Sequence, residues 1–188
     1  FFWFYLHIQH CDSMKIMLSK LKELKPTGDF YFEDVIIKIC KGQDQELRAV
    51  NPPENFSNFG DLFIELQRLM IIGKNDDIFA KMDLYKTLAS EQLYLEMKGE
   101  VLGVTGKKSE ALDVIRQLEM LSTTQHVWPS RFAVIYMAIG DEKKAYEYLE
   151  KGIEERGLWM HMLPYYYPFY IKRNDPTFQA FMKRTWIN

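Results

Sequence analysis

A glycine and a small alanine recur at one fixed distance in this chain, and this spacing constrains the fold more than any other feature. Gly106 and Gly140 lie 34 residues apart, and Ala111 and Ala145 follow them at the same offset. Gly73 lies 33 residues before Gly106. A period of about 34 residues is typical of an array of helix–turn–helix units. The sequence therefore predicts a protein built from helical repeats.

The residues around each glycine fit such a unit. Glycine adopts the left-handed conformation that ends a helix more easily than other residues. The small residue five positions later lets the second helix approach the first, and Leu112, Ile115 and Leu118 then form one apolar stripe. Weaker copies begin at Gly42 and Cys11. Because no long strand-like alternation competes with this pattern, we predict an all-α fold.

The periodicity also predicts where the helices lie. Pro52 and Pro53 interrupt the chain between 49 and 61, and a last helix should start at Asp175. We expect one continuous domain with degenerate hairpins at 1–50, regular repeats at 51–156 and a proline-rich aromatic segment with a capping helix at 157–188. The expected helix pairs are 1–9 with 12–24, 29–41 with 44–50, 57–72 with 75–88, 91–105 with 108–122, and 128–139 with 142–156.

These units resemble the tetratricopeptide repeat (TPR) family. That family has a small residue and an aromatic residue in the first helix, a glycine at the turn and an alanine in the second helix. The resemblance is strongest over 91–156, moderate over 57–90 and weak over 1–50, and it implies a right-handed α-solenoid of about five repeats. The matching positions are Gly73, Gly99, Gly106, Ala111, Ala133, Tyr136, Gly140 and Ala145, with Leu102 where an aromatic residue is usual.

A narrower resemblance concerns the C-terminal part. The stretch from His126 onward is similar to the repeats of bacterial multidomain regulators, which follow a winged-helix, cyclase or kinase module. Those repeats end in a short Arg-x-Asp-Pro-x-Phe helix, matched here by Arg173, Asp175, Pro176 and Phe178. The resemblance implies a regulatory domain. Because the sequence begins with Phe1 instead of Met, we expect it to be a fragment of a longer protein or a processed product.

Composition and motifs exclude several functions. The chain has 188 residues and a net charge of −2, without the basic face that nucleic-acid binding needs. His7, His10 and Cys11 could share one helical face, but a closed zinc site needs four ligands. We find neither a nucleophile elbow nor a phosphate-binding loop. The sequence therefore predicts a non-enzymatic protein without cofactor or metal.

The cysteines and the first residues bear on location. Two cysteines, Cys11 and Cys40, are too few for a disulfide framework. They favour buried thiols of a reducing compartment, with a single bridge as the alternative. The apolar run at 1–6 is too short to span a bilayer, which takes about 20 residues. We therefore predict a cytoplasmic protein, with an upstream membrane anchor as the alternative.

The predicted binding surface is the concave groove that TPR arrays form with their first helices. Glu96 and Glu100 make it acidic, so it should repel an acidic peptide and favour a basic, apolar segment of a partner or of an upstream domain. A ligand-sensing regulatory domain is the first alternative. The second alternative is a spacer that joins a homodimer through the aromatic stretch 164–170. That stretch could also be a docking patch, but we expect it to lie over the last repeat as a cap. The residues predicted to line the groove are Phe63, Gln67, Met70, Leu93, Glu96, Glu100, Val104, Val127, Ser130, Val134 and Met137.

Overall fold

A computed structural model of the chain describes residues 10–157 and 159–185. The described residues contain helices and no β-strand, which confirms the all-α prediction. The helix predicted at 1–9 lies outside them. The elements are α2 (Cys11–Leu24), α3 (Tyr31–Cys40), α4 (Asp44–Arg48), α5 (Phe59–Ile72), α6 (Asn75–Leu88), α7 (Glu91–Val104), α8 (Lys108–Leu121), α9 (Pro129–Ala138), α10 (Glu142–Glu154), the 3-10 helix η1 (Met160–Tyr165), α11 (Tyr167–Tyr170) and α12 (Pro176–Thr185).

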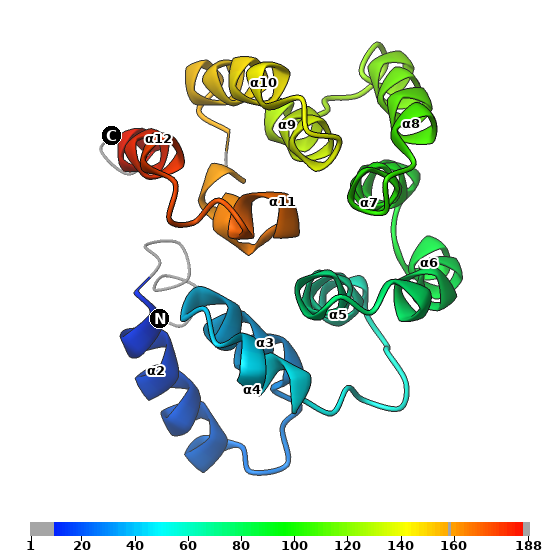
Figure 1. The fold of residues 1–188 in the computed structure, drawn as a ribbon. Helices are drawn as coiled ribbons and strands as arrows, with labels where there is room; N and C mark the ends of the chain where they lie inside the picture. Colours follow the sequence, from blue (N-terminus) through cyan, green and yellow to red (C-terminus); the bar gives the residue numbers. More distant parts are fainter. Residues whose placement is uncertain (1–9, 158, 186–188) are drawn as a thin grey trace.

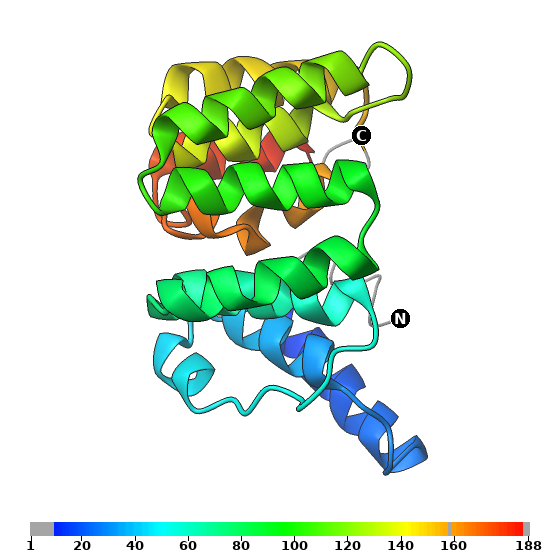
Figure 2. The ribbon, with the colours of Figure 1, turned by 90° about the vertical axis from the view of Figure 1, so that its right-hand side faces the viewer.

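The helices between 59 and 154 form three consecutive pairs. Helix α5 packs on α6, α7 on α8, and α9 on α10. Figure 1 shows the first helix of each pair on the inner side of an arc and the second on the outer side, with α11 in the middle. In the rotated view of Figure 2, helices α6, α7 and α8 run in roughly the same line across the molecule, one above the next, and α5 lies behind α6. The first helices α5, α7 and α9 therefore line the inner side of the arc together.

The same turn closes the first helix of each pair. Gly73, Gly106 and Gly140 adopt the left-handed conformation, with φ of 76°, 80° and 79°. After Gly106, the Lys107 amide donates to the Leu102 carbonyl at 2.8 Å, and equivalent bonds follow the other two glycines. This six-residue bond is the Schellman ending of a helix, which suits glycine because it lacks a Cβ. The repeat in sequence is thus a repeat in backbone geometry.

Small residues let neighbouring helices approach closely. Ala111 and Ala145 are fully buried where α8 and α10 meet their partners. On α7, a Cβ atom added at Gly103 would lie 2.6 Å from the Ala138 Cβ, closer than real Cβ atoms come. Gly99 faces α9 in the same way, since its added Cβ would meet Ile135. The distance between α7 and α9 is therefore fixed by glycine.

The proline-rich aromatic segment lies against the inner helices. Tyr165, Phe169 and Tyr170 are buried, so this stretch does not form an exposed docking patch. The segment contacts α9, α5 and α3, and the Tyr167 amide donates to Gln67 Oε1 at 2.7 Å. It therefore covers more than the last repeat, because its backbone extends along the concave side as far as α5.

Helix α12 closes the C-terminal end of the fold. Asp175 Oδ1 accepts hydrogen bonds from the Thr177 amide at 2.8 Å and the Phe178 amide at 3.1 Å. These bonds hold the pKa of the Asp175 carboxyl below its ordinary value. Phe178 is 2% exposed and stacks on Phe169, with 5.2 Å between ring centroids. The Arg173 guanidinium lies over a tyrosine ring of α11. All four residues of the predicted motif thus belong to this end of the fold, with Pro176 as the first residue of α12.

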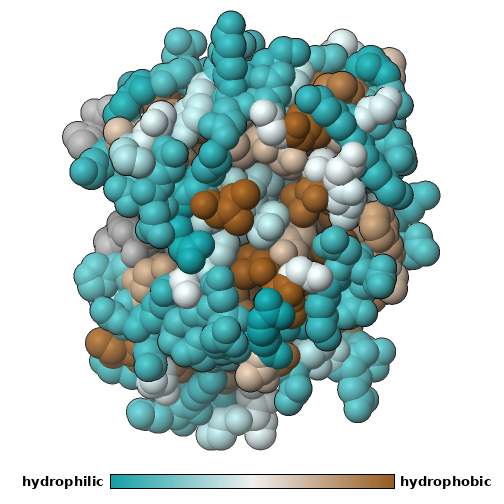
Figure 3. Space-filling view, viewed as in Figure 1, coloured by the Kyte–Doolittle hydropathy of each residue, from teal (hydrophilic) through white to brown (hydrophobic). Residues whose placement is uncertain are grey.

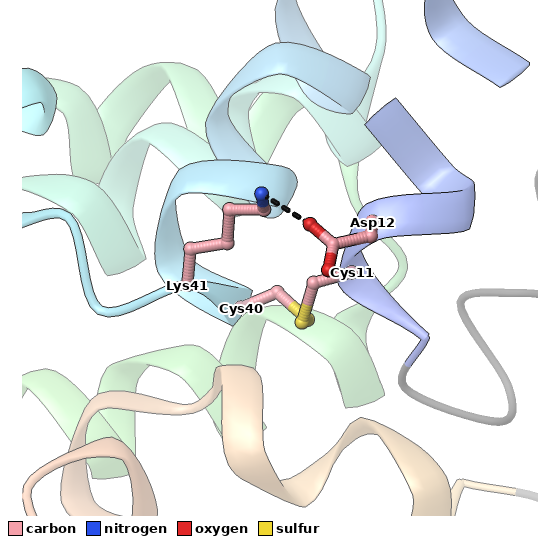
Figure 4. Close-up of a disulfide and its surroundings, with 4 residues drawn as sticks. All are labelled: Cys11, Asp12, Cys40 and Lys41. Carbon is pink, nitrogen blue, oxygen red and sulfur yellow. Dashed lines mark hydrogen bonds and ion pairs between the residues drawn. A yellow bond between two sulfur atoms is a disulfide. The ribbon is translucent and has the colours of Figure 1, made fainter. Parts of the chain in front are cut away.

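A disulfide joins the first two described helices. Cys11 and Cys40 are bonded, with Cα atoms 5.8 Å apart, and the Lys41 ammonium pairs with the Asp12 carboxylate beside them (Figure 4). The prediction of two buried thiols is therefore wrong, and the single bridge is correct. Spacing along the chain did not show that both residues lie at the same end of the α2–α3 pair. Because disulfides persist in oxidising compartments, the cysteines no longer favour the cytoplasm.

Among the described residues, no helix is both long and apolar enough to cross a membrane.

Candidate binding pocket

A pocket of about 470 Å³ opens on the inner side of the arc. Figure 3 shows apolar residues gathered in the middle of this face, surrounded by hydrophilic ones. Most lining residues come from the inner helices α5, α7 and α9 and from the segment around η1. They are Phe32, Phe59, Gly60, Phe63, Tyr85, Leu93, Glu96, Met97, Glu100, Arg131, Val134, Trp159, His161, Met162 and Tyr166.

Helix α7 supplies the acidic part of this pocket. Leu93, Glu96 and Glu100 are spaced three and four residues apart, so they share one face of the helix. The opposite face of α7 carries Leu95 and Leu102, which pack in the core. Because α7 buries both faces, Glu96 and Glu100 are removed from bulk water.

Glu96 pairs with an arginine of the next inner helix. Arg131 Nε lies 3.2 Å from Glu96 Oε2, and both side chains are buried. Burial raises the pKa of Glu96, while the positive charge of Arg131 opposes that rise. The guanidinium also lies 5.0 Å from the ring centroid of Trp159 and 5.5 Å from that of Tyr166. The arginine is thus held between a carboxylate and two aromatic rings.

Glu100 is more deeply buried and only partly satisfied. Its Oε2 accepts a hydrogen bond of 2.9 Å from Gln67 Nε2, and its Oε1 has no hydrogen-bond partner within the described part of the chain. Burial raises the pKa of Glu100 to about 8, although Gln67, Arg131 and the Tyr167 backbone favour the charged form. A half-satisfied carboxylate at this depth is costly, which makes the site a candidate for binding.

A third buried carboxylate, Glu65, shows the contrasting case. Glu65 accepts from Arg68 through both oxygens, at 2.6 Å and 2.9 Å, and also from the Tyr31 hydroxyl. Arg68 additionally donates to the Leu47 carbonyl at 2.8 Å. Both oxygens of Glu65 therefore have hydrogen-bond partners, and the network around this carboxylate joins α3, α4 and α5.

The predicted groove residues divide into two groups. Phe63, Leu93, Glu96, Glu100 and Val134 line the pocket. The others do not line it, because the η1–α11 segment lies on the concave side and neighbouring helices bury several of them. This second group consists of Gln67, which bonds to that segment, together with Met70, Val104, Val127, Ser130 and Met137.

Several lining residues were absent from the sequence prediction. Trp159, His161 and Tyr166 come from the segment that was expected to cover only the last repeat. Arg131 was overlooked although it is the one charged residue in the apolar stretch from 127 to 140. A lone arginine among buried residues signals a buried ion pair, and this signal could have been used.

The histidine and cysteine cluster at the N-terminus gives no metal site among the described residues. His7 lies outside them, and Cys11 is bonded to Cys40. No group of three or more histidine, cysteine, aspartate or glutamate side chains is arranged to hold a metal ion anywhere in residues 10–157 and 159–185.

Comparison with known proteins gives no assignment: no family model, curated protein or solved structure matches this chain.

Proposed function

We propose that the helix pairs form a TPR-like α-solenoid, in which equivalent positions of successive units contact each other. Hydrogen bonds between side chains one repeat apart support this proposal. Their sequence separations are 34 for Tyr31–Glu65, 33 for Gln67–Glu100, 33 for Gln92–Gln125 and 34 for Glu150–Arg184. Two of these bonds join successive helices, α3 to α5 and α5 to α7, at nearly the same register, which is the arrangement expected of stacked repeats.

The proposed function is non-enzymatic binding of a partner protein. We infer that a basic, apolar segment of the partner, or of an upstream domain, docks on the inner face and places one side chain in the pocket. The observation that carries this proposal is a concave pocket lined largely by aromatic and aliphatic side chains, with a few charged groups converging in it. Aromatic residues such as Trp159 and Tyr166 are enriched among the residues that dominate binding energy at interfaces.

Trp159 allows a direct test because it lines the pocket yet is 43% exposed, so its replacement should leave the fold intact. Trp159→Ala should weaken binding of an apolar–basic peptide pool at least tenfold, measured by fluorescence anisotropy. Phe79→Ala is the matched control, since Phe79 is a half-exposed aromatic residue of α6 that does not line the pocket. Equal binding by the Trp159 variant and the parent would contradict the proposal.

A second candidate function is the sensing of a small organic ligand. It is favoured by the η1–α11 segment, which limits the concave side to a pocket within the usual volume range of about 300–1,000 Å³ for small-molecule sites. A saturable rise in melting temperature with a small amphipathic compound, but with no peptide, would favour this candidate.

The homodimer spacer is not proposed. It depended on aromatic side chains exposed at 164–170, and Tyr165, Phe169 and Tyr170 are buried within the chain instead.

A further inference from the structure

The net charge of the pocket restricts which side chains can bind in it. Glu96 and Arg131 neutralise each other as an ion pair. Glu100 adds a carboxyl group whose charge has no counter-charge at salt-bridge distance within residues 10–157 and 159–185, and its neighbour Gln67 is neutral. Above about pH 8, where Glu100 is ionised, these four side chains carry a net charge of −1. The complementary occupant is therefore a single positive charge on an apolar stem.

The hydrogen bonds around Gln67 fix which part of Glu100 is available. The Tyr167 amide donates to Gln67 Oε1, so the Gln67 amide nitrogen must point the other way, toward Glu100 Oε2. This arrangement holds the carboxyl group in one orientation and satisfies one of its oxygens. Oε1 remains without a hydrogen bond although the residue is only 1% exposed. An acceptor held in this way can take one donor.

The single open oxygen distinguishes between basic side chains. Arginine binds carboxylates best through two parallel hydrogen bonds, which require both oxygens. Lysine presents a compact ammonium group with donors that rotate freely and an aliphatic stem of four carbons. Phe63, Leu93 and Trp159 offer an apolar wall for such a stem.

We propose that the pocket recognises a lysine side chain of the partner segment, with Glu100 Oε1 accepting from the ammonium group and the aromatic walls covering the stem. This inference rests on the proposed function and specifies its chemistry. Trp159 and Tyr166 would border the stem, while Arg131 stays paired with Glu96 and excludes a second cation.

The experiment uses blocked hexapeptide pools in which one position is fixed and the others are random apolar residues. The fixed residue is lysine, arginine, acetyl-lysine or norleucine, and binding to the whole chain is measured by fluorescence anisotropy at pH 9, where both Glu100 and the peptide lysine are charged. We expect the lysine pool to bind at least tenfold more tightly than the acetyl-lysine and norleucine pools, because these lack the charge. The arginine pool should bind more weakly than the lysine pool.

Two variants assign this preference to the pocket. Glu100→Gln keeps the shape of the side chain and should abolish the preference for lysine over norleucine. Glu110→Gln, on the exposed surface of α8, should leave the preference unchanged. A thermal melt of each variant identifies any loss of folding. Binding of the norleucine pool, which carries no charge, measures the contribution of the apolar walls by themselves.

The possible outcomes distinguish failure of the lysine inference from failure of the proposed docking function. If the pools bind and Trp159→Ala weakens them, but lysine and norleucine bind alike, the lysine inference fails and the docking function stands. If no pool binds, or if Trp159→Ala changes nothing, the docking function fails and the inference fails with it. If free hexylamine binds as tightly as the lysine pool and its binding depends equally on Glu100, the occupant is a small amine. That result would overturn the inference that the pocket binds a lysine of a partner segment.

Discussion

The regular units at 91–154 and the N-terminal helices at 11–48 are built from similar helices but are held together differently. In the regular units, Gly99 and Gly103 bring α7 against α9, and buried faces of both helices interlock. Helix α2 buries only Met14 and Leu18 fully, and the disulfide and the Lys41 ion pair secure it to α3. Where the repeat pattern fades, specific cross-links compensate for the smaller packed area.

At a fixed pH, the largest effect should come from enlarging a glycine in the regular units. Gly103→Leu would place a side chain where even a Cβ meets the Ala138 backbone at 3.0 Å. Because that backbone cannot move freely, we expect a loss of about 3 kcal/mol in the free energy of unfolding, measured with urea. Ser109→Leu, on the exposed side of α8, is the control and should change little. A small loss for Gly103→Leu would mean that α7 and α9 are not fixed at this distance.

Removing the disulfide should have a smaller and more local effect. Replacing both Cys11 and Cys40 by serine should cost about 2 kcal/mol, because α2 loses its covalent tie and has little buried surface to replace it. Hydrogen exchange should accelerate in 11–24 and stay slow in 91–154. A reducing agent should reproduce the effect in the parent protein and do nothing to the double variant. Uniform acceleration along the chain would show that the two regions unfold as one unit.

Buried charge should make stability depend on pH in the regular units. Glu100 has its folded pKa raised to about 8 from an ordinary 4.5, so the folded state holds its proton more tightly than the unfolded state. Its stabilising contribution is complete below the ordinary value and is lost as pH rises through about 8. As pH rises, the free energy of unfolding should fall by up to about 1.4 kcal/mol per pH unit.

Glu100→Gln should flatten this dependence, since its amide does not titrate. Glu96, Arg131, Tyr85 and His161 share the pocket and are present in both proteins, so the difference between parent and variant isolates Glu100. Urea unfolding at several pH values between 5 and 9 measures the difference. Parallel curves for parent and variant would show that Glu100 does not titrate in this range.

The smallest effect should come from a helix cap in the regular units. Asp141 accepts a hydrogen bond of 3.2 Å from the Lys144 amide at the start of α10. Asp141→Ala should cost about 1 kcal/mol, because that amide loses its partner. Asp141→Asn, which keeps an acceptor oxygen, should recover most of the loss in the same thermal unfolding experiment.

Local structure was largely determined by the sequence alone. The predicted helix pairs from 57 to 156 agree with α5 to α10 within about two residues at each end. Gly73, Gly106 and Gly140 marked the turns, and Asp175 marked the start of the last helix. These features follow from the helical period and from backbone conformations that particular residues favour, and both depend on neighbours along the chain.

The composition of the pocket was decided only by the tertiary structure. The Tyr167 amide reaches Gln67 across 100 residues, and the Tyr170 hydroxyl reaches Asp44 across 126. No local pattern encodes such separations, so nothing in the sequence indicated that this segment would narrow the groove to a pocket. The pairing of Glu96 with Arg131, the half-satisfied Glu100 and the Cys11–Cys40 bond likewise depend on how helices pack in space. Side chains distant in sequence become partners only once the inner helices have been brought together.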